Sequence, residues 1–282
     1  MSTLVIARLT FAEAARRRIL LAALILGVIF LIIYGLGFHF ILADVQRSMR
    51  RPSLVQLNEI RNFLMMAGMY VVNFLTIMMT VLTSVDTLSG EITSGTIHTM
   101  VSKPIRRWEI LMGKWLGFAG MVSLYLLLMA GGVAGLVFAL SGYTAPHPLA
   151  GIALMWLNAL LLLSVSLMGG TLFSTLANGV MVFGLYGIAF IGGWIEQIGT
   201  FLQNQAASQT AVNIGVITSL ILPSEALWKR AASELQSPLV AALGFSPFTS
   251  TSVPSNAMIV YAAIYLLVVI ALAIRLFNAR DL

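Results

Sequence analysis

The fold of this chain is decided by residues 149–195, which read LAGIALMWLNALLLLSVSLMGGTLFSTLANGVMVFGLYGIAFIGGWI. No Asp, Glu, Lys, Arg or His occurs in this stretch. A helix crosses the hydrocarbon core of a bilayer with about 20 mainly apolar residues, so the stretch is too long for one crossing. The local turn chemistry lies at residues 174–179, where Ser, Thr, Asn and Gly occur together. We therefore predict two membrane spans here, at residues 150–173 and 180–195.

The composition of the whole chain is typical of a membrane protein. Of its 282 residues, 59% are apolar and 9% are charged, with a mean hydropathy of +0.97, whereas soluble domains carry about 25% charged residues. The apolar runs are continuous, which indicates helices, because the strands of a membrane barrel alternate apolar and polar residues. We predict an all-α integral membrane protein that forms a single domain over residues 1–282. Four further spans bring the predicted total to six, at residues 19–38, 62–85, 115–140 and 258–276.

The segments outside these spans differ in character. Residues 2–18 carry four arginines and an apolar stripe at Leu4, Ala7, Phe11 and Ala15, which predicts an interfacial lead-in helix. We expect a polar connection at residues 39–61 and an end of the second span at Asp86. Residues 196–257 are predicted to be a long external connection before the last span. Within it, residues 211–222 are apolar but too short to cross, which favours a re-entrant or surface-lying segment.

The basic character of the chain indicates its orientation. The net charge is +6, and in a membrane protein such an excess favours the positive-inside bias over nucleic-acid binding. Six crossings place both termini on one side, and that side collects ten of the 16 Lys and Arg residues. We therefore predict a multi-pass protein of the cell inner (plasma) membrane, in contact with membrane lipids, with cytoplasmic termini and a cytoplasmic segment at residues 86–114. The apolar run after residue 18 has the length of a span and no small-residue cleavage site follows it, so we expect no cleaved signal.

Several chemistries find no support in the sequence. Gly113-Lys114 lacks the upstream glycine of a phosphate-binding loop and is followed by Trp115, so this chain is not expected to bind and split ATP by that route. There are no cysteines, and the three histidines are scattered, which leaves no metal-ligand spacing. No Asp, Glu, Lys or Arg falls in the middle of a predicted span, which argues against proton-coupled transport. We predict no enzyme activity and no cofactor in this chain.

A polar, ionisable island separates the second and third predicted spans. Residues 91–114 read EITSGTIHTMVSKPIRRWEILMGK. We expect Gly90-Glu91 to break the preceding span, Gly95-Thr96 to add a bend and Pro104 to fix the exit. Ile97, Met100 and Val101 give a short helix an apolar face, which is typical of a segment that docks into a groove on another protein. An ordinary solvated loop is the alternative reading of the same residues.

The island resembles the signature of the ABC-2 type permeases, the membrane subunits of type-2 ABC exporters. The resemblance implies a permease whose island is a coupling helix that docks on a separately encoded ATP-binding subunit, where ATP and Mg bind. It also implies a second permease chain, as a homodimer, and export of a substrate. Residues 222–228 further resemble the nitrous-oxide-reductase maturation permease group. The coupling residues that the resemblance implies are Glu91, Gly95, Thr96, Ile97, Met100, Pro104, Arg107 and Lys114.

Other features leave two readings open. Gly113 with Gly117, and Gly131 with Gly135, permit close helix contacts, either inside the chain or at a dimer seam. Glu196 is expected to be solvated at the outer boundary of the fifth span. An uncharged polar stripe on the second span predicts either a substrate pathway or helix–helix contacts, and its members are Asn73, Thr76, Thr80 and Ser84.

Two other classes of function compete with a transporter. A lipid-modifying membrane enzyme would need a convergent His, Asp, Glu or Ser constellation at one membrane boundary, and the sequence offers none. A membrane scaffold that recruits a cytosolic partner would use the same island without transport. The lack of charges within the spans disfavours small ions and favours an amphipathic or lipid-like substrate.

Overall fold

The computed structural model describes residues 2–48, 53–95, 106–199, 205–239 and 253–280, and within them the chain is helical with no strand. Six helices are long and apolar enough to cross a membrane, namely α2, α3, α5, α6, α7 and α11. The prediction of an all-α protein with six spans is therefore confirmed. The helices are α1 (Ser2–Arg16), α2 (Arg18–Ser48), α3 (Leu54–Thr93), α5 (Arg107–Ser141), α6 (Pro148–Leu172), α7 (Thr175–Gly199), α8 (Gln205–Ile221), α9 (Ser224–Leu235) and α11 (Asn256–Ala279).

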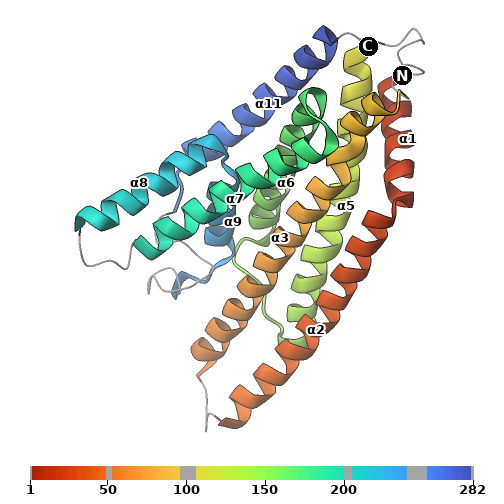
Figure 1. Ribbon diagram of the computed structural model, residues 1–282. Coiled ribbons are helices and arrows are strands. Elements are labelled where there is room, and N and C mark those ends of the chain that lie inside the picture. The colour runs from red at the N-terminus through yellow and green to blue at the C-terminus, as the bar shows by residue number, and fades with distance from the viewer. Residues whose placement is uncertain (1, 49–52, 96–105, 200–204, 240–252, 281–282) are drawn as a thin grey trace.

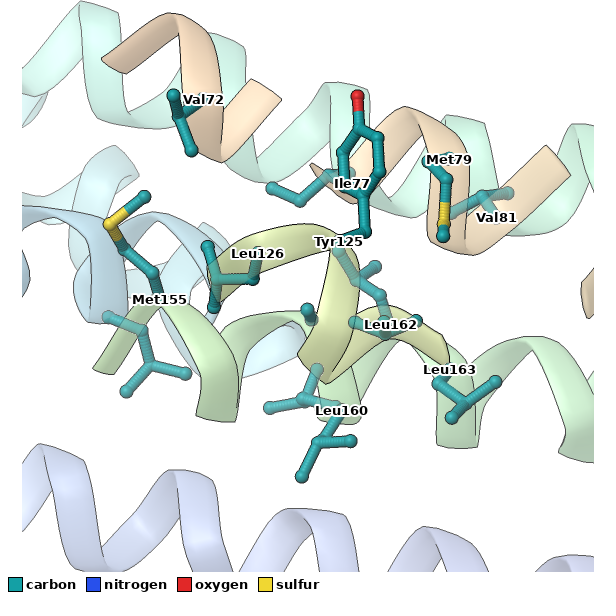
Figure 2. Packing of buried hydrophobic residues seen from close by; sticks show 14 of the residues in the cluster. Val72, Ile77, Met79, Val81, Tyr125, Leu126, Met155, Leu160, Leu162 and Leu163 are labelled. Atoms are coloured by element: carbon teal, nitrogen blue, oxygen red, sulfur yellow. The ribbon is translucent and has the colours of Figure 1, made fainter. Parts of the chain in front are cut away.

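Helix α6 lies at the centre of the bundle. It contacts α3, α5, α7, α9 and α11, and it is the most buried of the six candidate spans. Figure 2 shows part of the core that results, in which Leu162 of α6 lies beside Tyr125 of α5 and the Tyr125 ring lies beside Ile77 of α3. Because α6 has neighbours on every side, its apolar residues show no single-faced pattern in the sequence, and it reads as hydrophobic all round.

The predicted split of residues 149–195 into two spans is confirmed. Helix α6 ends at Leu172 and α7 begins at Thr175, so the turn itself is Phe173-Ser174. The Asn178 N–H donates to the Ser174 carbonyl at 2.8 Å, which makes residues 175–179 the first turn of α7 and lengthens the fifth span beyond the predicted 180–195. At the beginning of α6, the preceding helix α5 is terminated by Gly142, which adopts a left-handed conformation (φ 68°), and α6 starts at Pro148.

Two predicted interruptions are wrong because the helices continue past the apolar spans. The expected connection at residues 39–61 is mostly helical, since α2 runs to Ser48 and α3 begins at Leu54 with Ser53 and Gln56 as a capping box. Asp86 does not end the second span, and Gly90-Glu91 does not break it, because α3 continues to Thr93. A helix satisfies its backbone hydrogen bonds internally, so it does not stop where its side chains turn polar.

The predicted external connection at residues 196–257 is also largely helical where the structure describes it. Helices α8 and α9 form a pair bent by 106°, either a broken span or a re-entrant loop. Helix α8 lies along α7 (Figure 1), and α9 packs on α6. Glu196 is not solvated as predicted, because its carboxylate lies 2.6 Å from the Lys229 ammonium and both side chains are at least nine-tenths buried.

The N-terminal helix predicted at residues 2–18 is present as α1, which packs on the beginning of α5. A Cβ atom added at Gly117 of α5 would lie 2.7 Å from the Ala7 carbonyl oxygen, so this glycine pair packs within the chain. Nothing lies within 4 Å of a Cβ added at Gly131 or Gly135. The buried face of α1 holds Thr10 and Ala14, whereas Leu4 and Phe11 of the predicted stripe are exposed. That exposed face is the one available to lipid.

Candidate functional site

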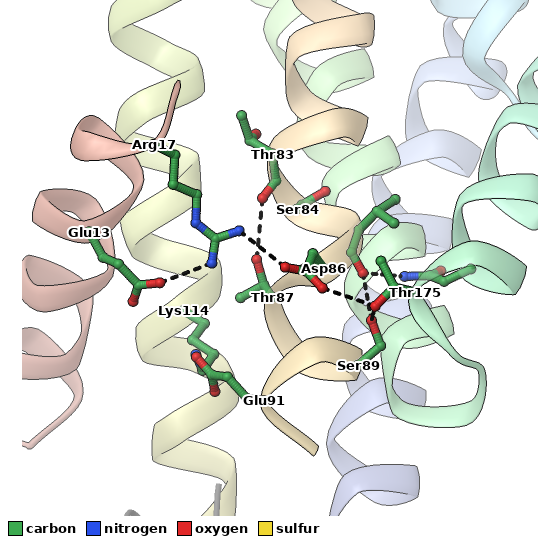
Figure 3. Close-up of polar contacts among 12 residues, drawn as sticks. Glu13, Arg17, Thr83, Ser84, Asp86, Thr87, Ser89, Glu91, Lys114 and Thr175 are labelled. Atoms are coloured by element: carbon green, nitrogen blue, oxygen red, sulfur yellow. Dashed lines mark hydrogen bonds and ion pairs between the residues drawn. The ribbon is translucent and has the colours of Figure 1, made fainter. Parts of the chain in front are cut away.

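A buried ion pair joins the end of α3 to the beginning of α5. The Lys114 ammonium donates to the Glu91 carboxylate, and their side chains are 3% and 15% exposed. Figure 3 shows the two residues reaching toward each other from neighbouring helices. Removing one partner of a buried pair costs about 3–5 kcal/mol because the other charge is left without compensation. The pair therefore fixes the spacing of the two helices that flank residues 96–105.

Helix α3 ends in the turn that the sequence predicted at Gly95. The Ser94 N–H donates to the Gly90 carbonyl at 2.9 Å, and Gly95 follows with φ 74°, in the left-handed region. This conformation is open to glycine and costs other residues about 1–2 kcal/mol. The bend at Gly95 is thus a property of the backbone. Thr96, Ile97, Met100 and Pro104 lie outside the described residues.

The beginning of α5 is tied to the ends of two other helices. The Glu109 carboxylate accepts the Arg106 N–H at 3.2 Å, which satisfies one of the free donors at the start of α5. The Arg107 guanidinium donates to the carbonyls of Asn278 at 3.2 Å and Arg280 at 2.6 Å, at the C-terminal end of α11. Arg280 in turn donates to the Thr171 carbonyl near the end of α6. Arg107 therefore holds α11 to α5.

A second polar chain connects α1, α3 and α7 at the same end of the bundle (Figure 3). Arg17, between α1 and α2, lies 2.9 Å from a Glu13 oxygen and 3.8 Å from an Asp86 oxygen of α3. The Thr175 hydroxyl of α7 donates to Asp86 at 2.9 Å and lies 2.9 Å from the Ser89 hydroxyl. These contacts would thus transmit a displacement of the last turns of α3 to α1 and α7.

The uncharged stripe of α3 lies deeper, against α6. Its four residues are at most 6% exposed. Thr76, Thr80 and Ser84 donate to the carbonyls four residues earlier, and the Ser84 hydroxyl lies 2.8 Å from the Ser166 hydroxyl of α6, within hydrogen-bond distance. The Asn158 amide of α6 lies 3.5 Å from the Asn73 amide oxygen. This geometry supports the helix–helix alternative, and a pathway along the stripe stays a prediction.

The structure adds residues that the sequence reasoning missed. Arg17, Asp86 and Thr175 were read as parts of a basic lead-in, a span end and a turn, and no spacing rule joins residues so distant in sequence. Asn178 is fully buried and donates to the carbonyls of Val85 at 3.1 Å and Ser166 at 2.9 Å. In the sequence Asn178 was read as part of the turn at residues 174–179, and no spacing rule pointed to its contacts with α3 and α6. Among the described residues, no group of His, Cys, Asp and Glu is arranged to hold a metal ion.

The fold and the site together define a multi-pass helical membrane protein in which polar contacts between helices cluster near the end of α3 and the beginning of α5. Both chain ends lie at the end of the bundle where α3 ends and α5 begins (Figure 1). The sequence profile of the ABC-2 family transporter proteins matches residues 4–282, and the chain belongs to this family. It is the membrane subunit of an ABC-2 family transporter and has no ATPase domain of its own. Nucleotide binding lies in a partner subunit, and family members bind no cofactor.

The comparison with known proteins identifies the family of this chain and no subgroup within it. No curated protein matches this chain. The finer resemblance of residues 222–228 to the nitrous-oxide-reductase maturation permeases gains no support from the match. In the structure, Leu222, Leu227 and Trp228 are buried, so packing at the α8–α9 corner accounts for these residues without a subgroup.

Proposed function

We propose that two copies of this chain pair in the cell membrane and that residues 86–114 of each copy form the cytoplasmic segment that couples to an ATP-binding subunit. Both termini are cytoplasmic in this proposal, and the substrate moves outward. The observation that carries it is the buried Glu91–Lys114 pair, which clamps together the two helices on either side of residues 96–105. A charge buried in protein is costly unless it is paired, so a pair of this kind holds its two helices in one geometry.

The clamp offers a mechanical route from the docking segment into the bundle. A push on residues 96–105 reaches α3 and α5 together, because the ion pair joins them. From α5 the displacement passes through Arg107 to the end of α11. From α3 it passes through Asp86 to Thr175 of α7. In this reading Arg107 and Lys114 are positioning residues inside the permease, while Ile97 and Met100 face the partner subunit.

The remaining site residues have different roles in the proposal. Glu91 and Gly95 shape the exit from α3, and Thr96 and Pro104 bracket the docking helix. In the buried stripe Asn73, Thr76, Thr80 and Ser84, the first and last residues contact polar side chains of α6 and so hold α3 against it in the described conformation. Substrate would meet this stripe only if α3 separates from α6 during the transport cycle. Membership in a transporter family favours transport over the scaffold and enzyme alternatives.

The proposal is tested by Glu91→Gln in the complex of the chain with the ATP-binding subunit that copurifies with it. The substitution leaves Lys114 buried beside a neutral amide, so we expect the clamp to loosen. The amount of substrate transported per ATP hydrolysed should fall roughly five-fold or more, the size of a typical coupling free energy. The measurement compares transport with ATP turnover in reconstituted vesicles.

Glu59→Gln is the matched control. Glu59 lies near the opposite end of α3 and hydrogen-bonds the Ser237 hydroxyl at 2.5 Å, so the same change is made on the same helix, remote from the docking segment. The ratio of transport to ATP turnover should stay at the wild-type value in this variant. A wild-type ratio in Glu91→Gln, or a purified chain that never associates with a nucleotide hydrolase, would contradict the proposal.

A further inference from the structure

A cavity of about 280 Å³ lies where α8 and α9 meet the end of α7 and the beginning of α11. Most of its wall is apolar and includes Val216 and Leu220 of α8 and Met258 of α11. Glu196 and Lys229 also line it. The cavity thus combines an apolar wall with one built ionic contact.

The ionic contact is held firmly by the surrounding helices. The Lys229 ammonium donates to Glu196 at 2.6 Å, and the two side chains are 5% and 9% exposed. A Cβ atom added at Gly215 of α8 would lie 2.3 Å from a Glu196 oxygen, so the glycine makes room for the carboxylate. An ammonium has three hydrogen-bond donors and a carboxylate about four acceptor positions, so a pair that is neutral as a whole still offers both kinds of contact to a ligand.

The position of the cavity indicates which kind of ligand can reach it. The bent pair α8–α9 stands in the chain between the candidate spans α7 and α11, and Val216 and Leu220 are each 49% exposed. Apolar walls of this kind are poor partners for water. An apolar cavity of about 150 Å³ accommodates benzene, so this cavity has room for about ten carbon atoms.

We propose that this cavity binds a single-chain amphiphile, with an aliphatic chain of about ten carbons along the α8 and α11 wall and an uncharged polar head against the Glu196–Lys229 pair. An uncharged head is favoured because the pair already neutralises itself, and a charged head would have to compete with one partner. The inference is independent of the proposed coupling to an ATPase, because its test measures binding alone.

The experiment uses the full-length chain in phosphatidylcholine vesicles and a ten-carbon alcohol with a diazirine at the end of its chain. After irradiation, mass spectrometry of the peptides should find the label concentrated in residues 212–229 and 253–258. Val216→Trp fills the cavity and should lower this labelling several-fold. Ile217→Trp is the matched control, since Ile217 is the next residue of α8, is 57% exposed and does not line the cavity. It should label as the wild type does.

Competition with unlabelled compounds tests the head group. Decanol should displace the probe several-fold better than decanoate or decylammonium. Equal labelling of exposed apolar residues on α2 and α11, or unchanged labelling in Val216→Trp, would overturn the site. Displacement by either charged compound as efficient as that by decanol would overturn the uncharged head. If Val216→Trp does not fold, Val212→Trp on the same wall takes its place under the same criterion.

Discussion

At the scale of single residues, the most informative ionisable groups are those that form ion pairs between helices. Two buried ion pairs lie in the described residues, Glu91–Lys114 and Glu196–Lys229. Each lies toward the end of a long helix, where the spans turn polar, and each joins two helices. A lone charge in this position would cost several kcal/mol, whereas a neutral pair holds its helices in one geometry. Replacing a residue of either pair should therefore change the relative position of the two helices that the pair joins.

The left-handed turn at Gly95 gives a prediction with a matched control. Gly95→Leu should cost about 1–2 kcal/mol at the end of α3, because at φ 74° its Cβ atom comes too close to the following carbonyl oxygen. The displaced turn should lower transport per ATP hydrolysed. Gly95→Asn should stay near the wild type, since Asn tolerates this conformation. Reconstituted transport and ATP turnover are the measurements, and equal behaviour of the two variants would show that backbone strain is not the cause.

At the scale of helices, α1 is an integral part of the permease. The contact between α1 and α5 is more extensive than the contact between any other two helices. The close approach depends on Gly113 and Gly117, because a Cβ atom at Gly113 would lie 2.6 Å from the Ile6 side chain. Small residues at a helix interface permit such contacts in membranes. The lead-in helix is thereby fixed to the same helix that carries Lys114.

Gly117→Leu should detach α1 from α5. The added side chain meets the Ala7 carbonyl and the Thr10 side chain, neither of which can move without shifting α1. Hydrogen exchange of the amides in residues 2–16 should rise by at least about tenfold, which corresponds to a loss of about 1.4 kcal/mol of local stability. Gly131→Leu is the control, because nothing lies near a Cβ at that position of the same helix. Unchanged exchange in Gly117→Leu would refute the contact.

The helices also show which features a sequence can predict. The spans follow from apolar length alone, and the break between α6 and α7 follows from local turn chemistry. The helix ends were misjudged at Asp86 and Glu91, because both were treated as solvated span boundaries. Asp86 has a partner in Thr175 and Glu91 has one in Lys114, and such partners are set by packing between helices distant in sequence. The bend at Gly95 was predicted, because a positive φ depends on the residue itself.

At the scale of the whole molecule, the bundle has two unlike ends. One end holds both termini, the flanks of residues 96–105 and the contacts of Arg107 (Figure 1). The other end holds the end of α2 and the beginning of α3. Helix α6 runs between these ends and contacts most of the other long helices. A force applied at the first end therefore enters a bundle whose long helices share one central neighbour.

The absence of cysteine from the sequence allows a direct test of orientation. Ser94→Cys and Asn278→Cys place a single thiol at the end that holds the termini, and Ser53→Cys places one at the opposite end. All three positions are exposed. In intact cells a membrane-impermeant maleimide should label Ser53→Cys alone, and permeabilisation should expose the other two. Labelling of Ser94→Cys in intact cells would reverse the proposed orientation and exclude cytoplasmic coupling through this segment.

The location of the chain ends has a consequence for gene architecture. Both chain termini lie at the end of the bundle where α3 ends and α5 begins (Figure 1). A soluble domain fused by a short linker to either extremity would share a compartment with whatever binds there. One gene could therefore encode such a domain before or after this chain, in either order, with no extra membrane crossing to connect the two.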